Sequence, residues 1–153
     1  MVELYLPKTE DLWFREKLLG DLSTMSYNHA WGGTIPFPSE KWADWYDKWL
    51  LNHENKRFYR YIIKKETFLG EVAYRFDEER QCYIADVIVY APYRGCGYGG
   101  QALALLCQAA KENGVRELYD DIAIDNPAVA LFLRYGFSEI HRTSEYIWLK
   151  KRL

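Results

Sequence analysis

Cysteine, long apolar runs and excess charge of one sign are scarce in this sequence, and each absence excludes a class of protein. Cysteine occurs only as Cys82, Cys96 and Cys107, without Cys-x-x-Cys spacing, which argues against a disulfide framework or a zinc site and for a reducing compartment. No apolar run is long enough to span a bilayer, and the first residues lack a signal-peptide pattern. We therefore expect a cytoplasmic protein that holds no metal ion and binds no membrane.

The charge balance argues against a nucleic-acid partner. Lys and Arg number 20 and Asp and Glu number 22, so the net charge is −2, whereas a protein that binds a polyanion typically carries a basic excess. The hydrophobic fraction of 49% is typical of a globular chain and not of a disordered one. Because 153 residues show no internal repeat, linker or low-complexity tract, we expect one domain over residues 1–153.

The hydrophobic pattern predicts an α/β fold with three consecutive strands at its centre. Strands are expected at residues 2–6, 57–64, 68–76, 81–90, 115–124, 137–140 and 145–149. Polar turns at 65–67 and 77–80 join the second, third and fourth strands as hairpins. Helices are expected at residues 9–20, in a short piece up to 25, from 39 onward, at 98–112 and between 126 and 136.

Four aromatic residues share one face of the helix expected after Ser39. Trp42, Trp45, Tyr46 and Trp49 follow the i, i+3, i+4, i+7 rule. This spacing favours packing on the core over a ligand-binding box, because amphipathic helices normally bury their apolar face. Whether that face meets the core, a ligand or a second copy of the chain is left open, and so is a homodimer.

The loop at residues 29–38 is rich in glycine and proline and also carries aromatic side chains. Trp31 and Phe37 lie there in irregular chain. Because loops held on a rigid scaffold often carry recognition, we predict that Trp31 and Phe37 face the substrate.

The stretch at residues 86–100 predicts an anion site. A β-branched run ends at Pro92, a glycine-rich turn follows, and a helix begins at Tyr98. Glycines allow successive backbone N–H groups to point outward, the helix N-terminus adds partial positive charge, and Arg94 adds a full charge. A phosphate-bearing ligand fits this combination.

Two phosphate-binding patterns match this loop. Gly95-x-Gly97-x-x-Gly100 satisfies the dinucleotide pattern, with the acidic pair Asp120 and Asp121 further on, and an ordinary glycine-rich turn is a third interpretation. A dinucleotide loop follows the first strand of a large parallel sheet, whereas this loop lies about two-thirds along the chain, and too little sequence remains for such a domain. The dinucleotide interpretation is therefore disfavoured.

The spacing Arg94-x-x-Gly97-x-Gly99 resembles the (Gln/Arg)-x-x-Gly-x-(Gly/Ala) loop of the GNAT superfamily of acyl-CoA N-acyltransferases. A second segment, from Asp125 to Phe137, resembles that family's Asn-x-x-Ala-x-x-Leu-Tyr-x-x-x-Gly-Phe pattern, and the order of elements matches along essentially the whole chain. The resemblance implies a single mixed central sheet, an antiparallel meander plus a splayed parallel pair, flanked by helices. It also implies transfer of the acetyl group of acetyl-CoA to a primary amine, by direct attack in a ternary complex.

The resemblance assigns the cosubstrate contacts. In this family two central strands separate at a bulge, so that free backbone N–H groups, here of Val89 and Ala91, would hold the acyl carbonyl and pantetheine. The residues expected along the cosubstrate are Arg94, Gly95, Cys96, Gly97, Tyr98, Gly99, Asn126 and Phe132. Cys96 is interpreted as a small turn residue and not as a nucleophile, because the sequence places no histidine and acid beside it.

The chain departs from the family pattern where a proton donor is expected. Phe132 replaces the tyrosine that protonates the departing thiolate, and Asp125 stands in place of the asparagine, with Asn126 one step away. Another acid such as Tyr135, Tyr90 or Tyr119 could serve, or solvent could. The alternative function is a CoA-binding module with weak or no catalysis.

Carboxylates on the central strands are candidate general bases. Asp86 and Asp120 lie where a carboxylate is unusual, and the backbone of Val89 completes the predicted catalytic set. A structural alternative is that Asp120 and Asp121 hydrogen-bond the chain at a strand end. The acceptor is left open among a polyamine, an amino-acid derivative, a drug and a protein N-terminus.

Overall fold

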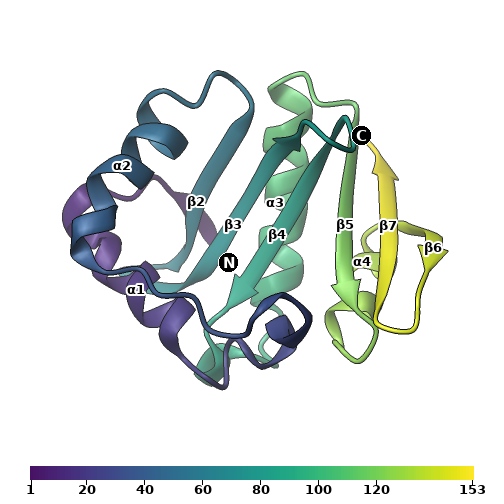
Figure 1. Cartoon of the computed structure of the whole chain (residues 1–153), viewed down its shortest axis with the longest axis horizontal. Helices are drawn as coiled ribbons and strands as arrows, with labels where there is room; N and C mark the ends of the chain where they lie inside the picture. The colour runs from purple at the N-terminus through teal and green to yellow at the C-terminus, as the bar shows by residue number, and fades with distance from the viewer.

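The computed structural model describes all 153 residues, apart from the side chain of Ala30. The described residues form a seven-stranded mixed sheet in the order β1-β2-β3-β4-β5-β7-β6 (Figure 1). β4 and β5 are parallel, and the other neighbours are antiparallel. The strand bounds are β1 Glu3–Tyr5, β2 Arg57–Lys64, β3 Thr67–Asp77, β4 Cys82–Val89, β5 Glu117–Ala123, β6 Ser138–Arg142 and β7 Tyr146–Arg152.

Helices cover both faces of the sheet. α1 and α2 lie on one face and α3 and α4 on the other (Figure 1). The α-helices are α1 Leu12–Gly20, α2 Trp42–Tyr46, α3 Tyr98–Glu112 and α4 Ala128–Arg134. Shorter helical turns are η1 Thr9–Asp11, η2 Ser26–Trp31, η3 Ser39–Lys41, η4 Asp47–Leu51 and η5 Ala91–Tyr93. The predicted order of elements is therefore confirmed, except that residues 22–25 form a turn in place of the short helical piece expected up to 25, and η2 occupies part of the expected loop.

The main core lies between the sheet and α3 with α4. Its fully buried members include Leu103, Leu106, Leu118, Phe132 and Leu149. Each such side chain stabilises the fold by about 1.5–3 kcal/mol through the removal of apolar surface from water. This core fixes α3, and with it the glycine loop, against β4.

The aromatic residues after Ser39 pack on the opposite face of the sheet. The Trp45 and Trp49 rings lie 4.7 and 6.3 Å from the Tyr59 ring of β2. The Trp42 indole N–H donates to the Phe37 carbonyl at 3.0 Å. The favoured interpretation of this stripe as a packing face is confirmed, but η3, α2 and the π-helical turn η4 form the segment in place of one continuous helix.

The parallel pair separates toward its carboxyl ends. β4 and β5 are in register at Tyr83 with Leu118 and at Ile84 with Tyr119, and their courses diverge beyond those pairs (Figure 1). The N–H of residue 90 donates to the Leu69 carbonyl of β3 at 2.8 Å. Because N–H directions alternate along a strand, the N–H of Val89 points away from β3, toward the gap.

The bulge lies in a different strand from the one expected. β4 pairs with β3 without interruption, whereas β3 carries one extra residue, Leu69, against β2. Gly70 beside the bulge is required by a close approach, because a Cβ there would overlap the Ile88 carbonyl oxygen and lie 2.9 Å from the Val89 Cα. The expectation of a bulge between the splayed strands was wrong, because backbone register leaves little trace in side-chain patterning.

We expect Gly70→Ala to destabilise the fold by about 1–3 kcal/mol, because its methyl group would displace β4 at Ile88. Gly20→Ala is the matched control, since its Cβ would meet nothing within 4 Å and alanine favours a helix. Urea unfolding of both variants measures the difference. Equal stability of the two variants would contradict the close approach of β3 and β4.

Candidate functional site

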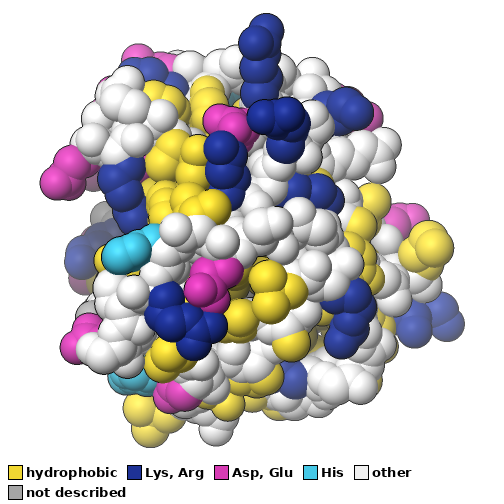
Figure 2. All heavy atoms as spheres, turned by 90° about the vertical axis from the view of Figure 1, so that its right-hand side faces the viewer, with side chains coloured by type: hydrophobic (Ala, Val, Ile, Leu, Met, Phe, Trp, Pro, Cys, Tyr) yellow, Lys and Arg dark blue, Asp and Glu magenta, His cyan; other side chains and the backbone are white. Residues whose placement is uncertain are grey.

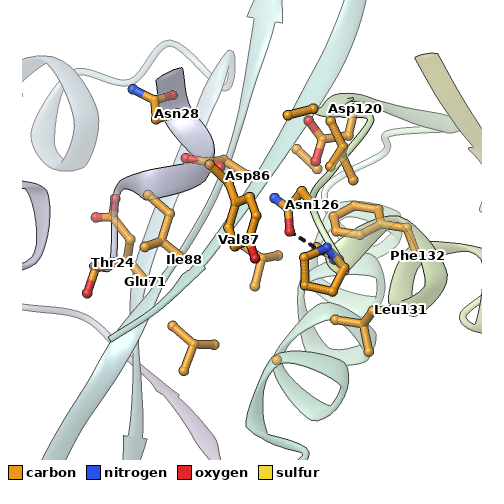
Figure 3. Close-up of a pocket in the computed structure, with 18 of the residues that line it drawn as sticks. Thr24, Asn28, Glu71, Asp86, Val87, Ile88, Asp120, Asn126, Leu131 and Phe132 are labelled. Atoms are coloured by element: carbon orange, nitrogen blue, oxygen red, sulfur yellow. Dashed lines mark hydrogen bonds between the residues drawn. The ribbon is translucent and has the colours of Figure 1, made fainter. Parts of the chain in front are cut away.

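A cleft of about 900 Å³ opens where β4 and β5 separate. Its walls come from these two strands, from the glycine loop at the start of α3, from α4 and from the segment that follows α1. In the close-up, β4 with Asp86 and Val87 lies on one side of the cleft, and Asn126 and Phe132 lie on the other (Figure 3). The gap between two strands is thus the organising feature of the site.

The glycine loop presents its backbone to the cleft. Gly95 and Gly97 both adopt φ of +82°, and a Cβ at either would meet nothing within 4 Å, so ligand has open access to this backbone. Gly99 in the first turn of α3 packs close to Val89 and Leu131, 3.5 and 3.3 Å from the position of an added Cβ. Together with the free N–H groups at the start of α3, this geometry fits a phosphate group.

Arg94 and Ala91 tie the loop to the segment after α1. The Arg94 guanidinium donates to the carbonyls of Val89, Ser23 and Thr24 at 3.1, 3.3 and 2.7 Å. The Ala91 N–H donates to the Thr24 hydroxyl oxygen at 3.0 Å. The Ala91 amide predicted to contact the cosubstrate therefore has an internal partner, and Arg94 lies at the joint between two walls of the cleft.

The residues predicted on the α4 side line the same cleft. Phe132 is buried, with its ring 4.9 Å from that of Phe137. The Asn126 side-chain oxygen accepts the Ala128 N–H at 2.9 Å and so caps α4 (Figure 3). Cys96, in the glycine loop, is exposed and lies outside the cleft lining, with its sulfur 3.9 Å from the Arg94 carbonyl oxygen.

Asp86 is the carboxyl most suited to accept a proton at neutral pH. It lies opposite Ala73 in the β3–β4 register and opens into the cleft, so water reaches it, while protein surrounds its other sides. Loss of hydration and the negative charge of Glu71 raise its pKa to about 7, against the opposing effects of Arg75 and Arg15.

Asp120 and Asp121 have different surroundings. Asp120 is buried at the cleft wall, and burial together with the nearby charge of Asp86 raises its pKa well above the ordinary value. Asp121 pairs with Arg80 at 3.2 Å. The two carboxyls that the sequence singled out on β4 and β5 thus interact electrostatically at the gap.

Of the two residues predicted to face the substrate, Trp31 lines the cleft and Phe37 does not. Trp31 of η2 lines the cleft, with its ring 6.5 Å from that of Tyr146. His29 lies 3.2 Å from Asp125, which connects η2 to the turn before α4. Phe37 is buried 5.5 Å from the Trp45 ring and lies outside the cleft lining.

The three tyrosines considered as proton donors lie away from the cleft lining. Tyr135 packs against Gly100, Tyr119 stacks on Trp148 at 5.3 Å, and Tyr90 packs on other aromatic rings. The tyrosines that do line the cleft are Tyr27, Tyr93 and Tyr98. Sequence analysis also missed Arg15, Glu71 and Arg75, which reach the cleft from α1 and β3 and carry no local motif.

In the part of the chain that the structure describes, no helix combines the length and apolarity needed to cross a membrane. Among the same residues, no group of three or more His, Cys, Asp or Glu side chains is arranged to hold a metal ion. On the side of the molecule that carries β6 and β7, basic, acidic and hydrophobic side chains are interspersed (Figure 2).

We expect Asp86→Asn to gain stability relative to the parent protein as pH rises from about 4 to 7. In this window the unfolded chain has released the Asp86 proton that the folded protein still binds, so increasing pH costs the parent stability that the neutral amide does not lose. Urea unfolding at pH 4.5 and pH 8 measures the change.

Asp77→Asn provides a control of opposite sign. Hydrogen bonds from the Arg80 backbone and side chain lower the pKa of Asp77, so its carboxylate stabilises the fold above the unfolded pKa, and the amide should lose stability at pH 8. A pH-independent difference between Asp86→Asn and the parent would contradict the inferred environment of Asp86.

Known structures share this fold over nearly the full chain. An N-acetyltransferase from Staphylococcus aureus Mu50 is 18% identical with a TM-score of 0.80, covering 99% of this chain and 98% of that one. The Salmonella typhimurium protein yncA, a putative acetyltransferase solved with acetyl-CoA, is 17% identical with a TM-score of 0.76, covering 100% and 94%. At these identities the likeness shows the fold alone.

Sequence relatives point the same way. An uncharacterized N-acetyltransferase, YycN of Bacillus subtilis, is 42% identical over 62 residues, and MJ1207 of Methanocaldococcus jannaschii, described likewise, is 24% identical over 124 residues. The matches cover 40% and 76% of this chain but 40% and 54% of those relatives. The model of the acetyltransferase (GNAT) family matches residues 21–137, which is most of the chain, and the protein therefore belongs to the GNAT family.

Proposed function

We propose that the protein is an N-acetyltransferase that moves the acetyl group of acetyl-CoA to a primary amine by direct attack in a ternary complex. The observation that carries this proposal is that the free Val89 N–H, the open glycine loop and Asp86 all line one cleft. We further propose that residues 1–153 act as one domain. A cytoplasmic location and a homodimer stay predictions from the sequence.

The cleft fits acetyl-CoA at both of its ends. The backbone around Gly95, Gly97 and Tyr98 would hold the pyrophosphate, and the edge of β4 at Val89 would pair with pantetheine. Two structural neighbours, yncA with acetyl-CoA and the Thermoplasma acidophilum PaiA acetyltransferase with coenzyme A, were solved with such molecules bound. Acetyl-CoA supplies an activated acetyl thioester.

Residues of the cleft would serve the first proton transfer and the developing negative charge, and solvent the remaining protons. Asp86 accepts a proton from the incoming ammonium group, which leaves a neutral amine able to attack. The Val89 N–H is placed to donate to the carbonyl oxygen as negative charge develops on it. As the C–N bond forms, the C–S bond breaks, and the amine releases its second proton to solvent.

Phe132 cannot protonate the departing thiolate, so solvent supplies that proton. This is chemically acceptable, because a thiol with a pKa of about 8.5 leaves tolerably without assistance. The absence of a general acid at Phe132 therefore slows acetyl transfer but does not prevent it.

Gly97→Glu should weaken acetyl-CoA binding by about tenfold or more, because it adds a negative charge where the pyrophosphate would lie. Gly114→Glu is the matched control. It has a similar positive φ of +88° and open space, but lies beyond the opposite end of α3. Isothermal titration with acetyl-CoA, and with NAD in parallel, measures both variants. Absence of acetyl-CoA binding to the parent protein would refute the proposed function.

The alternative function is a CoA-binding module with weak or no catalysis, and the observation that favours it is the apolar Phe132 at the cleft. If thiolate departure limits the rate, Phe132→Tyr should raise kcat by at least about tenfold, since general acids contribute about 10²–10⁴-fold. Phe137→Tyr adds a hydroxyl to the neighbouring buried ring and should bring no gain. Thiol release with an amine panel measures both. Release from the parent no faster than hydrolysis without amine would support the module.

A further inference from the structure

A second cavity of about 220 Å³ adjoins the cleft on the face covered by α1 and α2. This volume is several times the ~30 Å³ that one water molecule occupies in the liquid, so a small organic molecule fits. Arg15, Glu71, Arg75 and Asp86 line both spaces, so the cavity opens directly beside the proposed base. Its remaining walls include the aromatic rings of Trp49 and Tyr59 and the small Ala73.

Arg15 has hydrogen-bonding capacity that the described residues do not use. Its guanidinium carbon lies 4.7, 4.5 and 5.5 Å from the ring centres of Phe37, Trp45 and Tyr59. Its Nε and Nη1 atoms are buried and have no hydrogen-bond partner among the described residues. Aromatic rings offset the positive charge, but they offer no acceptor to N–H groups in the guanidinium plane.

Glu71 does not satisfy this arginine. Its Oε2 atom lies 3.8 Å from the Arg15 Nε, beyond hydrogen-bond distance, and the Tyr59 hydroxyl donates to the same oxygen. Because these two N–H groups are closed to solvent and Glu71 is an ion-pair partner, Arg15 favours an anionic ligand through its positive charge and not through these donors. A carboxylate best matches the planar fork of an accessible arginine.

Arg75 adds a second cation, besides Arg15, to the lining of this cavity. It is exposed in the cleft, and within the part of the chain that the structure describes no carboxylate oxygen lies within 4 Å of its charged nitrogens. On β3, Glu71 and Arg75 flank the small Ala73 on one face, and Ala73 lies opposite Asp86. The cavity lining thus carries two carboxyl groups, Glu71 and Asp86, and two guanidinium groups, Arg15 beside Glu71 and Arg75 on the other side of Ala73.

We propose that the acceptor is a small amine that carries a carboxylate close to its amino group, as a free α-amino acid does. This inference rests on the proposed function and names its substrate class. The carboxylate binds Arg75, in the positive field of Arg15, which fixes the amino group toward Asp86. A polyamine would instead place positive charge beside both arginines, and a protein N-terminus has no carboxylate at this distance.

The test compares amine acceptors with and without a carboxylate next to the amino group. Thiol release from acetyl-CoA is measured with L-leucine and L-phenylalanine, with their carboxamides, with the corresponding decarboxylated amines, and with spermidine. We expect kcat/KM for the amino acids to exceed that for their amides by at least about tenfold, although the amide has the more readily deprotonated amine. Arg75→Gln should reduce this ratio toward one, whereas Arg152→Gln, at the exposed end of β7, should leave it unchanged.

The outcomes separate this inference from the function on which it rests. Equal kcat/KM for acids and amides, or preference for spermidine, overturns the inference and leaves an acetyltransferase. Should no amine be acetylated, titration of the amino acids into the CoA-loaded protein decides the matter. Binding of the acid and not of its amide supports the carboxylate site, and absence of both overturns it. If the parent protein does not bind acetyl-CoA, the proposed function is overturned as well.

Discussion

The separation of β4 from β5 is the constraint on which the site depends. β4 is paired with β3 along its whole length, and β5 with β7, so each belongs to its own antiparallel half-sheet. Because the halves meet through the pairs at Tyr83 and Ile84 alone, their twists carry the strand ends apart. The gap leaves backbone N–H groups unpaired in the middle of a sheet, where water or a ligand, and not a neighbouring strand, satisfies them.

Local chemistry made much of this structure predictable from the sequence. The glycines at 95 and 97 predicted a turn with outward-pointing backbone N–H groups, and both adopt φ of +82°. The polar turns at 65–67 and 77–80 predicted the meander. These signals lie within a few residues of the structure that they determine. The acidic positions on β4 and β5 were conspicuous for a related reason, since charge on a central strand conflicts with burial.

What sequence analysis missed depends on contacts between distant segments. Arg15 meets aromatic residues of three separate segments of the chain, and Glu71 of β3 becomes unusual only when α1 places Arg15 beside it. Phe37 lies in the loop that suggested recognition, but burial against Trp42 and Trp45 leaves it outside the cleft lining. The internal partner of the Ala91 amide is a hydroxyl 67 residues away in the chain. Spacing along the sequence carries no record of such pairings.

The joint at Arg94 has a thermodynamic consequence. Three hydrogen bonds, two from the Arg94 guanidinium and one from the Ala91 N–H, connect the start of the glycine loop to Ser23 and Thr24. These two residues lie just before η2, which lines the cleft. A ligand that moves the glycine loop would therefore also disturb these hydrogen bonds to Ser23 and Thr24. In the proposed acetyltransferase, this joint would make the binding free energies of the two substrates depend on each other, and such a dependence is reciprocal.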